Sequence, residues 1–569
     1  MNGKRKFIQM KQINNSKFKI GILLQDFKMN KFESEIINLL NKEKNIDLYA
    51  IYENKKNTNI FKKIFFIFKK NSIYRNFEII FFKLVFSFEK FFLTFFFKDL
   101  KDLSNNFSVD KYIFKKIIHV KPIYSSKGIF SEYNDDDHNK IISEKLDLVV
   151  RTNSYEIFRN NKLNISRLGI ISFHHGDNSW NRGGPPGFWE TYLKKTQTGF
   201  IIQILNNKLD NGKILLKGEF ATKRFYILNQ HNLLKESNYF LLDLIKDLLS
   251  GKTGQYIQNQ YTSSKIFKIP SINIILKYVF VKLWLVLRLI IKKFILRQNQ
   301  RWHVSYSRSN FSHISFKNSK KIHNLDNRYF ADPFAVYYQN KHFIFVEDYS
   351  FINKKGSISV IEVDNNDNQK IYENIISETF HLSFPFVFKY ENIYYMIPES
   401  SEDNCIKLYK CKHFPDKWEF SHNLISNIFC ADTIMLNTNS KYFLITSEGK
   451  FNDLNSRLNI FFSDNPIGKN WIPHKLNPIY FNINDGRNGG LIINENKIFR
   501  VSQKFGINYL GDNQYGNEIS IRSIENITSE KFEETIINEI KPIFKKKLLG
   551  IHSMSGIDDF TVYDYCKYD

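Results

Sequence analysis

The stretch ADPFAVYYQNKHFIFVED, Ala331–Asp348, joins a short segment bearing Asp and Pro to a hairpin of aromatic and aliphatic strands. The pattern returns four times, and its starts lie about fifty residues apart, the period of a four-stranded propeller blade. The further copies are SFPFVFKYENIYYMIPES (Ser383–Ser400), CADTIMLNTNSKYFLITSEG (Cys430–Gly449), GRNGGLIINENKIFRVSQK (Gly486–Lys504) and the shorter GIHSMSGIDDFTVYD (Gly550–Asp564). Five units predict a five-bladed β-propeller, with Trp302–Ser305 as the candidate strand that closes its last blade.

The residues before 260 have a different pattern. Phe18–Leu24 and Ile46–Tyr52 are typical of buried strands, and Lys31–Asn41 between them has helical spacing, which favours an α/β sheet. The later elements of this sheet are expected at Leu146–Arg151, Leu168–Phe173, Phe200–Leu205, Ile214–Leu215 and, as a closing helix, Asn232–Leu249. A chain of 569 residues is too long to fold around a single hydrophobic core, so more than one domain is expected. We expect an α/β domain over residues 1–260, a basic helix and linker over 261–300, and an all-β propeller over 301–569.

Two stretches are rich in aromatic and aliphatic residues. Glu78–Leu100 lies in a Phe-rich helical insert at about residues 60–100, and Ile272–Arg297 lies in the linker. Charged residues interrupt both before about eighteen apolar residues accumulate, so a membrane-spanning helix is not favoured. Two interpretations stay open: helices packed against the domains, or interfacial helices on an anionic membrane.

Charge and cysteine content bear on partners and location. The formal net charge of +25 suggests an anionic partner, but the lysines are spread along the whole chain, so a nucleic-acid partner is not favoured. A membrane surface or a nucleotide-linked sugar stays open as that partner. The four cysteines have no metal-ligand spacing, and no signal peptide is expected at the N-terminus. We therefore expect no metal site and a cytoplasmic protein, with peripheral attachment to the inner membrane face as an alternative.

The loop SFHHGDNSWNRGGPPGFWE, Ser172–Glu190, follows the expected strand Leu168–Phe173. Loops at the carboxyl ends of parallel strands are where α/β sheets bind ligands. The segment Gly169–Leu215 around it resembles the core of the formyltetrahydrofolate-dependent formyltransferases. His174 matches the histidine of that family, and Asp210, 36 residues later in Leu-Asp-Asn-Gly, matches its aspartate.

This resemblance implies a formyltransferase-type, Rossmann-like domain over about residues 18–220. It also implies 10-formyltetrahydrofolate as cofactor and formyl transfer to the amine of an amino sugar, with Ser172, His174 and Asp210 as the catalytic residues. The chain departs from the family at two places. Ser172 replaces the family asparagine, and the Leu-Leu-Pro piece that shapes the folate pocket is absent. The other candidates for binding substrate or cofactor are His175, Asp177, Arg182, Gly183 and Trp189. For Asp177 an Asx turn, and for Trp189 core packing, are equally good interpretations.

The second half of the chain carries its own resemblance. ADPF, VED and GIHSMSG resemble the N-terminal region of plant glucosamine inositolphosphorylceramide transferase, and that region resembles the five-bladed propellers of arabinanase-type glycoside hydrolases. The resemblance implies that acids from different blades meet at a central funnel, where Asp332 matches the catalytic base. The candidate residues are Asp332, Glu347, Glu399, Asp432, Glu448, Arg500, Gln503 and His552. Turn formation and hydrogen bonding between blades are the alternative roles for these residues.

Three functional hypotheses follow. The first is an enzyme that transfers a formyl or related one-carbon acyl group to an amino sugar in envelope glycan synthesis, with the propeller holding the glycan. The second is a glycan-active propeller, hydrolytic or transferring, whose formyltransferase-like domain has kept only a binding role. The third is a non-catalytic scaffold that binds glycans.

Overall fold

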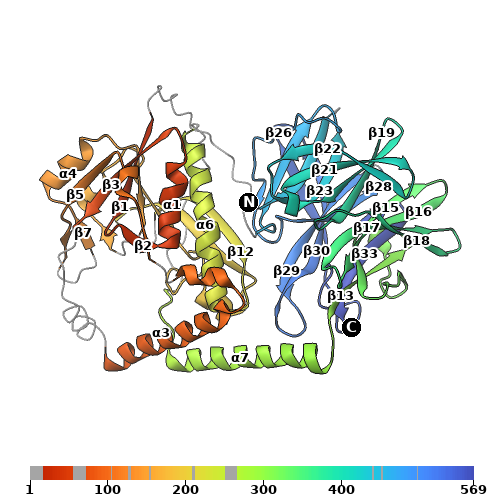
Figure 1. Cartoon of the computed structure of the whole chain (residues 1–569), viewed down its shortest axis with the longest axis horizontal. Coiled ribbons are helices and arrows are strands. Elements are labelled where there is room, and N and C mark those ends of the chain that lie inside the picture. Colours follow the sequence, from red (N-terminus) through yellow and green to blue (C-terminus); the bar gives the residue numbers. More distant parts are fainter. Residues whose placement is uncertain are drawn as a thin grey trace. The chain divides into compact units, whose positions relative to one another are not determined.

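The computed structural model describes residues 17–54, 72–103, 106–125, 130–152, 156–207, 212–249, 266–438, 441–449, 453–495 and 497–569. The chain forms two compact units. The first unit is Met1–Gly218 with Thr222–Trp284, and the second is Glu219–Ala221 with Leu285–Asp569. Figure 1 shows an α/β sheet in the first unit and β-sheets in the second.

The first unit is built on a seven-stranded sheet with the order β12-β11-β10-β8-β1-β3-β5. The five strands from β5 to β10 are parallel, whereas β11 pairs antiparallel with β10. Its strands are β1 (Phe18–Leu24), β3 (Ile46–Glu53), β5 (Lys116–Val120), β8 (Leu148–Arg151), β10 (Ile170–His174), β11 (Gln197–Ile204) and β12 (Lys213–Ala221). The predicted strands are therefore confirmed, with shifts of a few residues at their ends. β1 is buried at nearly every position, as expected for a parallel strand covered on both faces.

Two helices cover one face of this sheet. In α1 (Lys31–Asn41), the side chain of Asn30 caps the first turn by accepting from the Glu33 N–H at 3.0 Å. The long α6 (Tyr226–Leu249) lies beside it in Figure 1, and Asn238 of α6 donates to the carbonyl of Phe32 at 2.8 Å. α6 begins six residues before the expected Asn232, because its first turn packs Tyr226 and Ile227 into a buried aromatic cluster.

The remaining elements of the first unit are short, apart from two helices. They are β2 (Lys28–Asn30), β4 (Asn106–Ser108), β6 (Ile123–Tyr124), β7 (Phe130–Glu132), β9 (Ile157–Phe158), α4 (Asp135–Ile142) and α5 (Phe188–Tyr192). The two long helices are α3 (Ile73–Thr94) and α7 (Ile272–Ile290). The helix α7 begins in the first unit and continues beyond Trp284 into the second, where a π-helical turn, Ile291–Ile295, extends it. Each predicted stretch thus contains a helix, whereas residues 60–71 of the insert and 261–265 of the linker lie outside the described residues. Among the described residues, no helix is both long enough and apolar enough to cross a membrane.

The described residues of the second unit form five blades, of which the third has five strands and the others have four. The first three blades are β15 (Arg328–Tyr338) to β18 (Gln369–Ile376), β19 (Ser383–Tyr390) to β22 (Lys417–Ser426), and β23 (Cys430–Thr438) to β26 (Ile472–Pro473) with β27 (Tyr480–Phe481). The fourth runs from β28 (Asn488–Asn494) to β31 (Phe532–Ile540). The fifth joins β32 (Met554–Ile557) and β33 (Phe560–Tyr568) to β13 (Gln300–Ser307) and β14 (Lys320–Lys321). The bounds of the inner strands are β16 (Lys341–Ser350), β17 (Lys355–Val363), β20 (Ile393–Glu399), β21 (Cys405–His413), β24 (Lys441–Glu448), β25 (Arg457–Ser463), β29 (Lys497–Ile507) and β30 (Asn513–Ile527).

All five predicted hairpins are found, and the sheets form the β-propeller that their spacing predicted. The closing strand is also confirmed, because β13 pairs antiparallel with β33 from Gln300–Tyr568 to Ser307–Thr561. The fifth blade therefore combines both ends of the propeller sequence, which closes the ring without leaving a free sheet edge between its first and last strands.

Candidate functional site at the propeller centre

A repeated bulge positions the first acids of the site. The opening strands of the first three blades each have a register shift, between Ala331 and Phe334 in β15 and at the equivalent places in β19 and β23. Asp332 has a φ of 48° and Asp432 a φ of 52°, both in the left-handed region. A bulge turns a side chain out of the regular alternation, and Asp accepts this conformation better than most residues. In the second blade Phe384 occupies the same position, so the bulge itself belongs to the fold.

Asp332, His552 and Asp564 form a buried chain of ion pairs. The Nε2 atom of His552 lies 3.1 Å from Asp332 Oδ1, and its Nδ1 atom lies 2.7 Å from Asp564 Oδ2. Asp564 also accepts from the backbone N–H groups of Asp332, His552 and Ser553. Burial opposes charge on His552, but the carboxylates of Asp564 and Asp332 outweigh it and raise the pKa of the imidazole well above its usual value. We therefore expect His552 to be an imidazolium.

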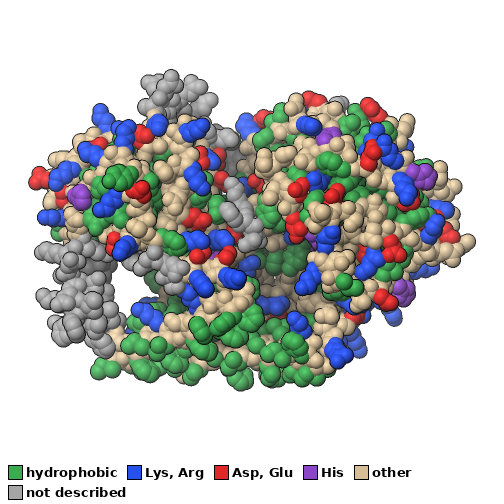
Figure 2. Space-filling model, in the orientation of Figure 1, with side chains coloured by type: hydrophobic (Ala, Val, Ile, Leu, Met, Phe, Trp, Pro, Cys, Tyr) green, Lys and Arg blue, Asp and Glu red, His purple; other side chains and the backbone are tan. Residues whose placement is uncertain are grey.

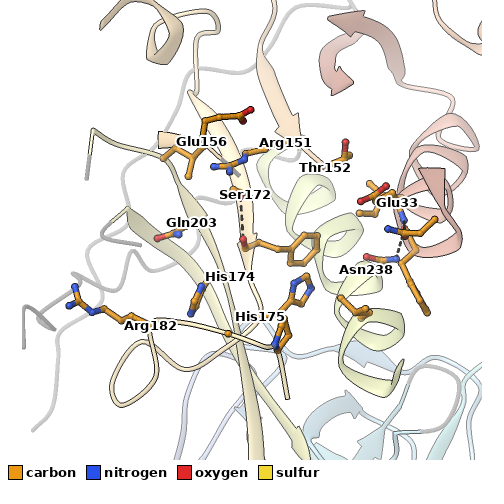
Figure 3. Close-up of a pocket in the computed structure, with 18 of the residues that line it drawn as sticks. Glu33, Arg151, Thr152, Glu156, Ser172, His174, His175, Arg182, Gln203 and Asn238 are labelled. Atoms are coloured by element: carbon orange, nitrogen blue, oxygen red, sulfur yellow. Dashed lines mark hydrogen bonds between the residues drawn. The ribbon is translucent and has the colours of Figure 1, made fainter. Parts of the chain in front are cut away.

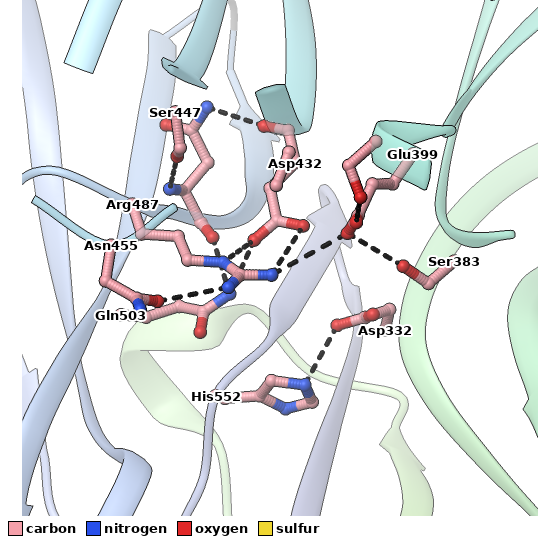
Figure 4. Close-up of polar contacts among 12 residues, drawn as sticks. Asp332, Ser383, Glu399, Asp432, Ser447, Asn455, Arg487, Gln503 and His552 are labelled. Carbon is pink, nitrogen blue, oxygen red and sulfur yellow. Dashed lines mark hydrogen bonds and ion pairs between the residues drawn. The ribbon is translucent and has the colours of Figure 1, made fainter. Parts of the chain in front are cut away.

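Arg487 joins two further acids from different blades (Figure 4). Its Nε donates to Asp432 Oδ2 at 2.5 Å, and its Nη2 lies 3.6 Å from Glu399 Oε2. Gln503 donates to the same Asp432 oxygen at 2.9 Å, and Ser383 donates to Glu399 at 2.9 Å. Arg487 itself lies directly before β28, and its guanidinium bridges Asp432 of the third blade and Glu399 of the second.

Glu347 lies across the strand pair from Asp332, since its partner in the β15–β16 register is Ala331. Burial, followed by the negative charge of Asp332, raises the pKa of Glu347 well above its usual value. Burial acts on Asp332 in the same direction, but His552 and Arg487 outweigh it and lower the pKa of Asp332. Two neighbouring carboxyl groups thus have pKa values pushed apart, which is the arrangement of an acid and a base in one site.

Half-buried side chains surround these acids. Trp302 stacks on His552 with ring centroids 3.8 Å apart, and Tyr515 makes an edge contact with the same imidazole at 5.7 Å. The guanidinium of Arg487 lies over the Tyr515 ring, and His381 lies 3.6 Å from Glu347. Aromatic rings beside carboxyl groups and a guanidinium are the usual components of a sugar-binding site.

Asp332, His552 and Asp564 also have ligand atoms within 4.8 Å of one another, the spacing of a metal site. Both imidazole nitrogens face carboxylates, so the two ion pairs of His552 engage the atoms with which it would bind a metal.

The structure brings most of the sequence candidates together and separates two. Asp332, Glu347, Glu399, Asp432, Gln503 and His552 belong to the cluster. Arg500 is instead buried inside the fourth blade, where it donates to both oxygens of Glu534. Glu448 lies one register position from the place that corresponds to Glu347 and accepts from Asn459.

Sequence reasoning missed three contributors, Arg487, Asp564 and Trp302. All three lie inside a quoted blade unit or the predicted closing strand: Arg487 directly before β28, Asp564 in β33 and Trp302 in β13. A charged or aromatic residue at such a place was the signal in the sequence that could have indicated them. Arg487 in particular follows Gly486, whose position would place a Cβ 2.4 Å from the Ser456 carbonyl carbon.

The first unit has a second candidate site, a cavity of about 560 Å³ at the carboxyl end of β10. Ser172, His174, His175, Arg182 and Gly183 line it, together with side chains from α1, β11 and α6. Figure 3 shows this pocket and the two histidines in it. The loop after β10 therefore borders a cavity at the edge where α/β sheets bind ligands. Asp210 lies outside the described residues.

Individual loop residues differ in their surroundings. His174 Nε2 lies 3.3 Å from the carbonyl of Asn181, which favours the tautomer with the proton on Nε2. Burial, with a smaller contribution from His174, lowers the pKa of His175 to about 3, so His175 is neutral. Asp177 pairs with Lys217 at 2.9 Å and accepts from the Ser179 N–H, as in an Asx turn. Trp189 is buried and donates to the carbonyl of Lys268 at 3.1 Å.

Comparison with known proteins bears mainly on the propeller. The family described as "Glucosamine inositolphosphorylceramide transferase 1, N-terminal" matches residues 318–558. Glucosamine inositolphosphorylceramide transferase 1 of Arabidopsis thaliana is 32% identical over 249 residues, which cover 43% of this chain and 31% of the relative. The chain thus matches less than a third of the length of that curated relative. The resemblance that ADPF, VED and GIHSMSG indicated is confirmed for the propeller region.

Two solved structures were also matched. An α-L-arabinofuranosidase from Podospora anserina has a TM-score of 0.32 at 9% identity, covering 42% of this chain and 90% of its own. A 4-N formyltransferase from Francisella tularensis has a TM-score of 0.26 at 16% identity, covering 44% of this chain and 76% of its own. Both scores are too low to bear on the fold of either unit.

Proposed function

We propose that the second unit binds a sugar residue at the propeller centre and performs acid–base chemistry on it, so that the chain acts in the synthesis or modification of a glycan. The observation that carries the proposal is the pair Asp332 and Glu347, whose pKa values are shifted in opposite directions within one buried cluster. The matched family supports it, because its name describes a transferase and includes glucosamine, an amino sugar.

The chemistry follows from the two protonation states. Asp332, kept ionised by His552 and Arg487, accepts the proton of an attacking hydroxyl group or water. Glu347, kept protonated by burial and by Asp332, donates its proton to the glycosidic oxygen that leaves. One carbon–oxygen bond forms and one breaks, and the site gains and loses one proton. With water as the nucleophile the result is hydrolysis, and with a sugar hydroxyl it is transfer.

The charge of the cluster favours an amino sugar. Burial keeps Glu347 protonated and raises the pKa of Asp432 to about 8, so the carboxyl groups of Asp332, Glu399 and Asp564 are the ones set against the two cationic side chains Arg487 and His552. An excess of carboxyl groups in a buried site attracts a sugar ammonium group and disfavours a phosphate. The ammonium group of a glucosaminyl residue is therefore the part of a glycan that this site attracts.

Calorimetric titration tests the binding step. Methyl glucosaminide, which carries the ammonium group, should bind the full chain at least about tenfold more tightly than methyl glucoside, which lacks it. Asp332→Asn should weaken this preference, whereas Glu347→Gln, which replaces an uncharged carboxyl group, and Asp559→Asn, at an exposed position of the last hairpin, should not. Equal affinity for the two glycosides, or an unchanged preference in Asp332→Asn, would refute amino-sugar binding at the centre.

Release of methanol from methyl glucosaminide tests the chemical step, because this poor leaving group needs the proton of Glu347 to depart. Asp332→Asn and Glu347→Gln should each lower the rate about a hundredfold or more, the usual contribution of a general acid or base. If the wild type binds the glycoside but turns it over no faster than Glu347→Gln does, the acid–base assignment is refuted. The propeller would then be a glycan-binding scaffold.

A second candidate function belongs to the first unit. The cavity beside Ser172 and His174 supports transfer of a formyl group to the amine of an amino sugar, the finer activity that the formyltransferase resemblance implies. Under this candidate a Rossmann-like domain would bind 10-formyltetrahydrofolate, with Ser172 and His174 donating to the developing oxyanion. A stable formyltetrahydrofolate analogue should then bind at micromolar concentration, and Ser172→Asn should keep or raise formyl transfer. Absence of binding up to millimolar concentration would refute it.

A further inference from the structure

The helix α3 has two apolar faces on opposite sides. Taken at about 100° per residue, Phe82, Phe86 and Leu93 fall on one side, and all three are buried. The opposite side carries a stripe at helical spacing that is exposed to solvent: Ile73, Phe77, Ile80, Leu84, Phe88 and Phe91. Phe88 is 71% exposed. A helix of a soluble domain normally places polar residues on this side, so the exposed stripe needs an apolar environment.

The helix α7 repeats the arrangement. Within the first unit, Ile275 and Tyr278 are buried on one side. The other side exposes Leu276, Phe280 and Leu283, and Phe280 is 71% exposed. These two stripes together are called the apolar helix surface below.

The two helices are fixed to one another within the first unit. Phe86 of α3 and Tyr278 of α7 have ring centroids 5.3 Å apart, and the Tyr278 hydroxyl donates to Glu89 at 2.8 Å. Figure 2 shows hydrophobic side chains gathered along the edge that α3 and α7 form. The stripes therefore make one surface from two separated parts of the sequence.

The charges on these helices select an occupant. Lys83 and Lys90 follow the margin of the stripe on α3, and Lys277 does the same on α7, whereas Lys282 lies over the rings of Tyr278 and Phe225. The acids of α3 are used internally, because Glu78 pairs with Arg75 and Glu89 accepts from Tyr278. The sequence of α7 contains no Asp or Glu. An apolar stripe bordered by lysine alone matches acyl chains beneath anionic headgroups better than it matches a polar protein surface.

We propose that the apolar helix surface seats the protein in the interface of a membrane that contains anionic lipid. The exposed Phe and Leu side chains enter the boundary between headgroups and acyl chains, and the lysines contact lipid phosphates. Because α3 and α7 lie on the surface of the unit, they bind in the plane of the membrane without crossing it.

Cosedimentation of the full chain with vesicles tests the proposal. The wild type should bind vesicles of phosphatidylglycerol and phosphatidylcholine in equal parts at least about tenfold more tightly than vesicles of phosphatidylcholine alone. The double variant Phe88→Ser, Phe280→Ser should lose at least about tenfold in affinity for the mixed vesicles. Lys83→Gln with Lys277→Gln should lower the preference for anionic vesicles and its sensitivity to salt.

A second double variant controls for the loss of two exposed apolar side chains. Ile352→Ser with Ile543→Ser removes two exposed apolar side chains from the second unit and should leave vesicle binding unchanged. The thermal unfolding of each variant should match that of the wild type, because the substituted side chains are exposed. Failure of the wild type to bind mixed vesicles, or full binding by the Phe88 and Phe280 variant, would overturn the proposal. Self-association that this variant abolishes, with no vesicle binding, would instead assign the surface to a second copy of the chain.

Discussion

Replacing Asp564 by alanine tests the energetics of the propeller centre. Asp564 is fully buried, pairs with His552 at 2.7 Å and accepts from three backbone N–H groups. Removing one partner of a buried ion pair costs about 3–5 kcal/mol, since the other charge is left without compensation. A domain of this size loses about 2 °C of unfolding temperature per kcal/mol. We therefore expect the transition of the propeller unit to fall by about 6–10 °C at neutral pH.

The pH dependence of this variant provides a second readout. Since the pKa of His552 is raised in the folded protein, its charge stabilises the fold fully below the unfolded value, and this contribution is lost as pH rises through the raised pKa. Asp564→Ala removes one of the carboxylates that raise the pKa of His552, so the stabilisation by the imidazolium should be lost at a lower pH. Differential scanning calorimetry measures both effects, with Asp559→Asn as the exposed control in the same hairpin. A transition within 2 °C of the control, as would follow from about 1 kcal/mol or less, would refute the reasoning.

Three further predictions concern the first unit. Lys162 and Glu53 pair with no exposed side-chain surface, so Lys162→Met should cost about 3–5 kcal/mol, and Glu53→Gln added to it should recover part of that loss in urea unfolding. A Cβ at Gly183 would lie 1.8 Å from the Phe267 carbonyl oxygen, so Gly183→Ala should lower the thermal transition by several degrees, whereas Gly184→Ala, whose Cβ would make an ordinary contact of 3.7 Å with Pro186, should not. Because the pKa of His175 is lowered to about 3 in the fold, acidification below its unfolded value of 6.5 should destabilise the unit, and His175→Gln should flatten this dependence in pH-dependent thermal scans.

The propeller was readable from the sequence because each blade repeats the same hairpin. The spacing predicted the five hairpins and the closing strand, and the placement of Asp332 and Asp432 followed from one repeated position. The ion pairs between blades were not predictable. Arg487 meets acids 55 and 88 residues away, and nothing in local spacing indicates which blades bring them together. Arg500 illustrates the converse, because its partner Glu534 lies two strands further on and holds it inside the blade.

The first unit was predictable where a pattern is local. The helix α1 has both its cap and its apolar spacing within twelve residues, and its predicted bounds agree with the structure. The helices α3 and α7 were predicted as helices, but a nearly continuous apolar sequence in α3 and a broad apolar face beside the basic side of α7 left their environment undecided. Only the structure shows which side is buried, because that depends on Tyr226, Phe188 and other residues far away in the sequence.

The two candidate sites demand different ligands, which makes them separable. A carboxyl-rich propeller centre suits a sugar ammonium group, while the cavity in the first unit is bordered by Ser172, His174 and Arg182. A chain that carries both could act on one glycan in two ways, and each activity can be removed without touching the residues of the other.

The central claim is that a sugar residue binds at the centre of the propeller, beside Asp332 and Glu347. A crystal structure of the full chain with a bound glucosamine-terminated oligosaccharide tests it most directly. The account predicts the terminal sugar within hydrogen-bonding distance of both carboxyl groups, with its ring against Trp302 or Tyr515. Oligosaccharide bound only elsewhere, with the Asp332–His552–Asp564 cluster unchanged and unoccupied at saturating ligand, would contradict it.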